Sequence, residues 1–247
     1  MRALNAPLTL WWAGPGLAAQ YRADLLQSAD RQRAQMTRSA RAERDWRVSR
    51  ALLQQVSAGS AGASDSDKAA PVSRSLSHSG GHAVVATAPA GWQVGVDLEA
   101  LRPRDTARLA PWCCSVEEAG ALAGSAADAD RLRAFYLLWT LKESFIKAAG
   151  LAFPADMRGV GLTGAGLPWN GWRLRAPGAG WRAWSAIVDD AWMVSVAWRA
   201  PDTAEASEAS DASAAQAPPD AGAGPVPLWR IAQGIASPRI TIAGRWS

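Results

Sequence analysis

The chain has 247 residues, of which 49% are hydrophobic and 19% are charged, and its formal net charge is +4. This composition suits one domain or two small halves with a shared core. The basic residues form no single block and no apolar run approaches the ~20 residues of a membrane span, so we expect neither a nucleic-acid partner nor a membrane. The start lacks a secretory apolar segment, and the adjacent Cys113 and Cys114 predict no disulfide, which favours a cytoplasmic protein.

The first hundred residues predict one strand, helical segments and a pair of strands. The order is a strand at 7–14, helical spacing over 17–35 and 37–56, and two β-branched runs at 82–88 and 92–101. The two runs are separated by Pro-Ala-Gly, which predicts a β-hairpin.

The second half predicts two helices and then three strands. Ser115 and Glu118 have the spacing of a capping box, so a helix should begin there. A second helix is expected over 131–149, with Asp130 as its N-cap and Gly150 at its end. Aromatic and β-branched residues predict strands at 171–176, 180–189 and 191–200. The layout indicates an α+β fold with antiparallel pairing.

The end of the chain changes in composition. Residues 201–226 consist of small, acidic and proline residues, so we predict a disordered acidic linker. Residues 227–247 are more apolar and form a C-terminal tail, whose role the sequence does not indicate.

The stretch V-G-V-D-L-E at 94–99 places two carboxylates on one face of a predicted strand. Asp97 and Glu99 share that face with Gly95, which leaves space beside them. Two like charges at this spacing repel unless a cation or a proton lies between them. Mg²⁺ is typically bound by one or two carboxylates together with waters and phosphates. The simpler alternative is a solvated strand end.

Two of the only three lysines in the chain, Lys142 and Lys147, flank Glu143 on a predicted helix. Glu143 and Lys147 are an i,i+4 pair, which can be a surface ion pair worth roughly 0.3–0.5 kcal/mol. The other basic residues are almost all arginines, so two lysines here indicate a need for compact ammonium groups. Such groups bind phosphate as point charges.

Two further segments could meet an anion. Ser77, His78 and Ser79 lie with two glycines before a strand, an arrangement that suits an anion but is also typical of a tight turn. Arginines recur every third residue from Arg38 to Arg50. Because that spacing drifts around a helix, only one or two of them can reach a phosphate.

Together these segments resemble the 4′-phosphopantetheinyl transferase superfamily. V-G-V-D-L-E, followed by F-Y-L-L-W-T-L-K-E-S-F-I-K-A-A-G, is similar to that family's paired signature, and S-L-S-H-S is similar to its histidine segment. The length resembles the surfactin-type branch. The resemblance therefore implies a monomer with two similar α/β halves, 1–100 and 101–200, related by pseudo-twofold symmetry, each a small antiparallel sheet packed on helices.

The resemblance also implies a reaction. Such an enzyme moves the 4′-phosphopantetheine arm of coenzyme A to a serine of an apo acyl or peptidyl carrier protein and releases adenosine 3′,5′-bisphosphate. It implies Mg²⁺, with Mn²⁺ as the alternative, bound by Asp97, Glu99 and Glu143. Glu143 and Lys147 would be catalytic. The implied contacts to coenzyme A are Arg44, Arg47, Arg50, Ser77, His78, Ser79, Lys142 and Lys147.

Some features depart from the family pattern, and two alternatives stay open. The glycine of a G-K-P segment is missing, and Lys68 in D-K-A-A-P is the nearest substitute. A Mg²⁺-dependent nuclease is disfavoured because Glu99 lacks a lysine two residues later. A non-catalytic homologue that only binds a carrier protein is the second alternative.

Overall fold

The structure is a computed structural model that describes residues 8–61, 72–151, 156–201 and 227–247. Its first half contains β1 (Thr9–Ala13), α1 (Ser28–Ala34), α2 (Ala40–Ala61), β2 (Val72–Ser79), β3 (His82–Pro89) and β4 (Gln93–Ala100). Its second half contains α3 (Thr106–Cys113), α4 (Val116–Ala123), α5 (Asp128–Ala149), β5 (Gly161–Thr163), β6 (Arg173–Arg175), β7 (Trp181–Val188), β8 (Trp192–Arg199), β9 (Leu228–Ile231) and β10 (Ile240–Trp246). Within the described part, no helix is both long and apolar enough to cross a bilayer.

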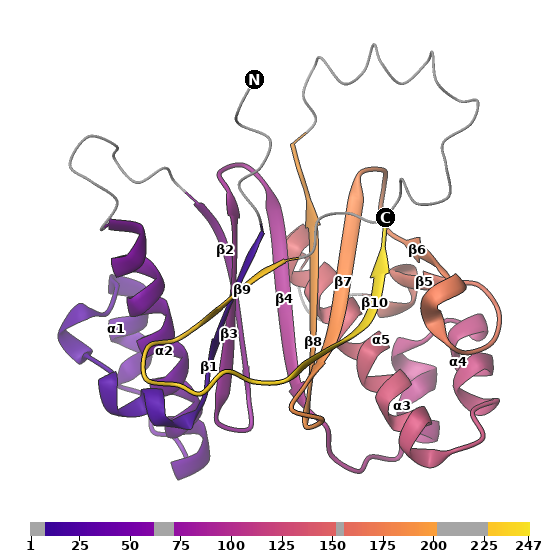
Figure 1. Ribbon diagram of the computed structural model, residues 1–247, viewed down its shortest axis with the longest axis horizontal. Coiled ribbons are helices and arrows are strands. Elements are labelled where there is room, and N and C mark those ends of the chain that lie inside the picture. The colour runs from indigo at the N-terminus through magenta and orange to yellow at the C-terminus, as the bar shows by residue number, and fades with distance from the viewer. Residues whose placement is uncertain (1–7, 62–71, 152–155, 202–226) are drawn as a thin grey trace.

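Two four-stranded sheets form the centre of the molecule (Figure 1). The first sheet has the order β2-β3-β1-β9 and the second has the order β10-β7-β8-β4; β5 and β6 form a separate pair. Among the described residues, the strand pairs are antiparallel except for β1 with β9, which are parallel. The predicted α+β class with small sheets packed on helices is confirmed, and the predicted pseudo-twofold symmetry stays a prediction.

Alternating side chains divide the interior into three apolar layers. One layer lies between the two sheets and takes the inward residues of five strands, among them Trp12, Val96 and Trp184. A second layer joins the outer face of the first sheet to α2, and a third joins the outer face of the second sheet to α5. The strands therefore have two apolar faces, as expected for sheets covered on both sides.

Gly95 sets the distance between α5 and the second sheet. A Cβ at this position would overlap the carbonyl oxygen of Ser144 and lie 2.5 Å from the backbone nitrogen of Ala148. The space that the sequence predicted beside Asp97 is therefore filled by the backbone of α5. This close approach brings Glu143 and Lys147 of the helix to the carboxylates of β4.

The predicted hairpin of 82–88 with 92–101 is wrong, although both strands exist. β3 pairs with β1 and β2, whereas β4 pairs with β8 in the other sheet. The reason is that both strands bury an apolar face in the layer between the sheets, so they lie across that layer from each other. β4 therefore belongs to the second sheet, although the sequence analysis placed its residues in the first half of the chain, 1–100.

The helix predictions had mixed success. The capping box is present, because the Ser115 hydroxyl accepts from the Glu118 nitrogen and the Glu118 carboxylate accepts from the Ser115 nitrogen. Gly150 ends α5 in the left-handed conformation, but the helix begins at Asp128, with Ala127 as N-cap in place of Asp130. The predicted helix at 17–35 is broken into two short 3₁₀ turns and α1.

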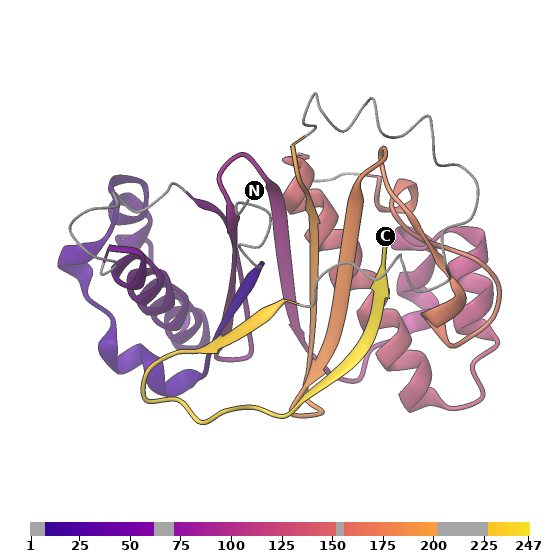
Figure 2. The same ribbon diagram turned by 45° about the horizontal axis from the view of Figure 1, so that its top comes forward.

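The tail belongs to both sheets. β9 lies at the edge of the first sheet and β10 at the edge of the second, and the connection between them crosses from one to the other (Figure 2). The linker predicted at 201–226 lies outside the described residues, apart from Pro201.

Candidate active site

The site predicted from the sequence lies along a seam between the edge strands β2 and β4. Serines on alternate positions of β2 face β4. The Ser75 hydroxyl accepts from the Val96 nitrogen at 3.0 Å. The Ser77 hydroxyl donates to Oδ1 of Asp97 at 2.8 Å, and the Ser79 hydroxyl donates to Oε2 of Glu99 at 3.0 Å. Side chains of one sheet therefore hold the carboxylates of the other in place.

Asp97 is the most enclosed of the three predicted metal ligands. It is 5% exposed, and the Lys147 ammonium donates to its Oδ1 at 2.7 Å and to the Val96 carbonyl at 3.1 Å. Its second oxygen, Oδ2, is buried and has no hydrogen-bond partner. A buried carboxylate oxygen without a donor is costly, so this atom is available to a cation.

Negative charge accumulates around Asp97. Burial raises the pKa of Glu99, and the charge of Asp97 raises it further. Burial also raises the pKa of Glu143, and the charges of Asp97 and Glu99 add to the effect while Lys147 opposes it. The carboxylates of β4 and α5 are thus close enough to disfavour one another's ionisation, which is the electrostatic signature of a site suited to a cation.

The donor set fits Mg²⁺ in chemistry but only partly in geometry. Asp97 and Glu99 supply hard oxygen ligands, and the orphaned Oδ2 of Asp97 is a free ligand atom. However, across residues 8–61, 72–151, 156–201 and 227–247 no group of three His, Cys, Asp or Glu side chains converges closely enough to hold a metal ion. Magnesium sites often use one or two carboxylates and complete the shell with water and phosphate, so two strand carboxylates suffice to begin one.

His78 of β2 is influenced by charged groups on other elements. Its partial burial lowers its pKa, and the positive charges of Arg50 and Lys147 act in the same direction, whereas Asp45 opposes them. The imidazole is therefore neutral at pH 7. Charges on two helices, α2 and α5, therefore act on His78.

The three predicted arginines of α2 have different surroundings. Arg50 pairs with Asp30 at 2.8 Å and lies 4.1 Å from the centroid of the Trp46 ring. Arg44 lies beside the turn between β2 and β3, where its Cδ is 4.0 Å from a Cβ placed on Gly81. Arg47 pairs with Glu43 at 2.8 Å.

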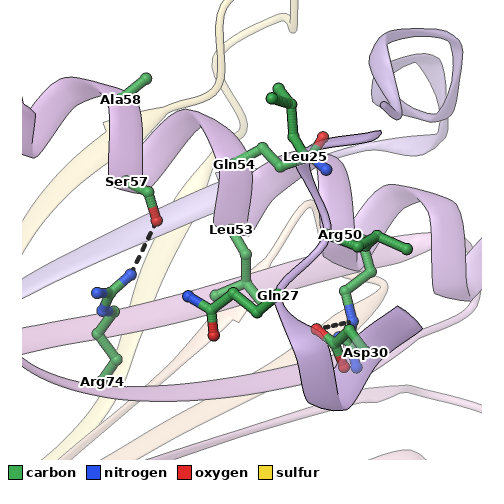
Figure 3. A pocket seen from close by; sticks show the side chains of 10 residues that line it. Leu25, Gln27, Asp30, Arg50, Leu53, Gln54, Ser57, Ala58 and Arg74 are labelled. Carbon is green, nitrogen blue, oxygen red and sulfur yellow. Dashed lines mark hydrogen bonds and ion pairs between the residues drawn. The ribbon is translucent and has the colours of Figure 1, made fainter. Parts of the chain in front are cut away.

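A cavity of about 540 Å³ opens beside Arg50, between α2 and the segment that precedes it. Figure 3 shows Arg50 reaching Asp30 at one side of the cavity, while Arg74 reaches Ser57 at the other. Leu25 and Leu53 contribute apolar lining. The predicted arginine region thus contains a hollow with both charged and apolar walls.

Lys142 lies outside the site. Its ammonium is fully buried and donates to Glu118 at 2.8 Å, to the Met157 carbonyl at 2.8 Å and to the Val160 carbonyl at 2.5 Å. An ammonium has three protons, so none is left for a phosphate of coenzyme A. The predicted coenzyme contact through Lys142 is not reproduced. The residue instead connects α5 to α4 and to the segment 157–160, which follows α5.

Sequence reasoning missed the roles of three residues that contact the predicted groups or their neighbours. Asp45 is buried and accepts from the Gly81 nitrogen at 2.7 Å, which fixes the turn beside His78. Ser75 is the third serine facing β4. Glu118 receives Lys142 in the interior. Only the regular alternation of Ser75, Ser77 and Ser79 was visible as a signal, because the other two partners are distant in sequence.

Part of the chain matches the model of a known protein family. Residues 93–197 match the model of the 4′-phosphopantetheinyl transferase superfamily. The search of curated proteins found no match. The matched stretch contains β4 with Asp97 and Glu99, and α5 with Glu143 and Lys147. Over these residues the chain is therefore similar to the 4′-phosphopantetheinyl transferase superfamily.

Proposed function

We propose that the protein transfers the 4′-phosphopantetheine arm of coenzyme A to a serine of an apo acyl or peptidyl carrier protein, with release of adenosine 3′,5′-bisphosphate. The match of residues 93–197 to the superfamily model supports a transferase of the phosphopantetheinyl type, with coenzyme A and a carrier protein as its partners. The observation that carries the proposal is the contact of Lys147 with Asp97, whose charge also acts on both Glu99 and Glu143.

The proposed reaction needs Mg²⁺, with Mn²⁺ as the alternative, held by Asp97 and Glu99 and completed by Glu143 directly or through water. The bound cation would neutralise charge on the diphosphate of coenzyme A and stabilise the transition state. Support comes from the orphaned Oδ2 of Asp97 and from the mutually raised pKa values of Glu99 and Glu143. Cation binding would relieve both features.

Glu143 is the proposed general base. The carrier serine oxygen attacks the phosphorus that bears the pantetheine arm, and its proton passes to Glu143. The bond from that phosphorus to the adenosine bisphosphate oxygen breaks, and Lys147 offsets the charge left there. Burial raises the pKa of Glu143, which makes its carboxylate a better proton acceptor than an exposed one.

The remaining coenzyme contacts are proposed at His78, Arg44 and Arg50. The charges of Arg50 and Lys147 both lower the pKa of His78. This supports one phosphate-binding region formed by Arg50, His78 and Lys147. Arg47 is a further candidate; it pairs with Glu43 just as Arg50 pairs with Asp30, so either arginine would have to share its acidic partner with a phosphate. Ser77 and Ser79 are assigned to holding Asp97 and Glu99, and any contact of theirs to the coenzyme would be additional.

The surfactin-type branch, a monomeric state and a cytoplasmic location are further parts of the proposal. Support for the branch comes from the fact that both sheets of a single chain contribute residues to the proposed site. Ser77 and His78 belong to the first sheet, whereas Asp97 belongs to the second and Lys147 to the helix that covers it. One copy can therefore supply the whole set.

A mass-shift assay tests the function directly. The protein is incubated with coenzyme A, Mg²⁺ and a panel of apo acyl and peptidyl carrier proteins, and each carrier is weighed by mass spectrometry. The expected result is a gain of one phosphopantetheine arm that EDTA prevents. A carrier that binds the protein but gains no mass, while a known transferase loads it, would favour the non-catalytic carrier-binding alternative.

A further inference from the structure

We propose that residues 227–247 act as a staple that fastens the two sheets to each other along the side opposite the β2–β4 seam. The inference concerns the fold, so it holds whether or not the proposed transfer reaction is correct. It rests on strand pairing, on aromatic packing and on polar anchors.

Strand pairing places one end of this segment in each sheet. β9 extends the first sheet in parallel register from Thr9 opposite Leu228 to Trp12 opposite Ile231. β10 extends the second sheet antiparallel to β7, from Ile240 opposite Val188 onward. In the strand orders, β9 and β10 are the edges farthest from β2 and β4. The staple therefore links the two sheets at the edges opposite the seam, where the chain can be followed from β9 to β10 (Figure 2).

Trp229 joins the sheets through the apolar layer between them. Its ring centroid lies 6.3 Å from that of Trp12 in the first sheet and 5.8 Å from that of Trp184 in the second. Trp12 and Trp184 are 2% and 1% exposed. Ile231 and Ile240 pack against the same layer. Removing the staple would expose large aromatic surfaces of both sheets at once, and that burial is the main attraction between apolar groups in water.

Polar anchors hold the staple at intermediate points. The Gln233 carbonyl accepts from Gln20 at 3.3 Å, and its nitrogen donates to Gln55 at 3.2 Å. Arg239 donates through its backbone to Asp189 at 2.7 Å and through its side chain to Asp190. The bonds of Gln233 attach the connection between β9 and β10 to the helices that cover the first sheet. The bonds of Arg239 attach it to the turn between β7 and β8.

At the opposite side, the sheets are linked differently. Within the described residues, the hydrogen bonds between β2 and β4 run through the hydroxyls of Ser75, Ser77 and Ser79, and no backbone ladder joins the two strands. A few side-chain hydrogen bonds hold two strands together less firmly than a ladder of backbone hydrogen bonds. We therefore infer that the staple, on the far side, fixes the position of one sheet relative to the other. Release of either end should loosen both sheets.

Hydrogen exchange of the full-length chain tests this coupling. Trp229→Ala should speed exchange of the β7 and β10 amides in the second sheet by about tenfold or more, as well as those of β1. The matched control is Trp112→Ala, because Trp112 is the same residue type but is 81% exposed; exchange in both sheets should stay as in the parent chain.

Ile240→Ala is the reciprocal variant, because Ile240 pairs with Val188 of the second sheet and packs against the layer between the sheets. It should speed exchange in β9 and β1, although the substitution lies beside the other sheet. If each variant speeds exchange only in the sheet that it touches, the two strands dock independently and the staple is refuted. If Trp229→Ala does not fold, the Ile240→Ala result decides alone.

Discussion

Asp97 combines the features that the proposed chemistry needs in one side chain. It has one oxygen bound by Ser77 and Lys147 and one oxygen without a partner. A substitution that keeps its shape but removes its charge therefore separates the electrostatic role from packing.

Asp97→Asn should abolish measurable Mg²⁺ binding in calorimetry and lower the transfer rate by about a hundredfold or more, because a neutral amide neither balances Lys147 nor binds a hard cation well. Asp24→Asn is the matched control, since Asp24 forms only an exposed pair with Arg22. Mg²⁺ binding of parent strength in the Asp97 variant would refute the ligand assignment.

Glu99 and Glu143 make a prediction about pH. Burial and neighbouring carboxylates raise both pKa values above the ordinary value of 4.5. At a pH just above 4.5, the two groups therefore bind more protons in the folded chain than in the unfolded chain. Their contribution to the free energy of unfolding falls as the pH rises from about 4.5 through the raised pKa values of the folded chain. The lowered pKa of His78 acts oppositely and costs stability as the pH falls below 6.5.

Denaturant unfolding between pH 4 and 8 measures this effect. Glu143→Gln should remove part of the fall in stability with rising pH, and saturating Mg²⁺ should have the same effect in the parent chain because a cation lowers the pKa of its ligands. A slope that is unchanged in Glu143→Gln would show that Glu143 ionises like an exposed carboxylate.

At the scale of elements, the contact between α5 and β4 decides the geometry of the site. Gly95→Ala should destabilise the chain by about 1–3 kcal/mol or more and reduce activity, because the added carbon meets helix backbone that cannot move aside. Gly120→Ala is the matched control, since a Cβ there meets no atom within 4 Å. Equal thermal midpoints for the two variants would contradict this account of Gly95.

The Lys142–Glu118 pair is the second decisive contact between elements. Lys142→Met should cost about 2–4 kcal/mol, because Glu118 would keep Arg175 but lose its ammonium partner, and the carbonyls of Met157 and Val160 would lose their donor. At temperatures where the variant stays folded, its KM for coenzyme A should equal that of the parent, whereas Lys147→Met should lose transfer. A raised KM with unchanged stability would return Lys142 to the coenzyme site.

At the scale of the whole molecule, sequence patterns predicted the elements better than their partners. The apolar runs indicated β3, β4, β7 and β8, and the capping box predicted α4, because these signals are local. The pairing of β4 with β8 depends on how two apolar faces are buried together, and no local signal encodes that. The same limit applies to the site: the residue types of Asp97, Glu143 and Lys147 were readable, but the serine seam and the buried role of Lys142 required the fold.

The apolar layer between the sheets leads to a prediction about cooperativity. Strands of both sheets supply its residues, and Trp229 of the tail packs in it against Trp12 and Trp184. Neither sheet can lose its partner without exposing one side of this layer, so the two halves should not unfold separately. Calorimetry should give a single transition whose calorimetric and van't Hoff enthalpies agree, as for one cooperative unit. Two resolved transitions would mean that each half is stable alone and that the layer between the sheets contributes little to folding.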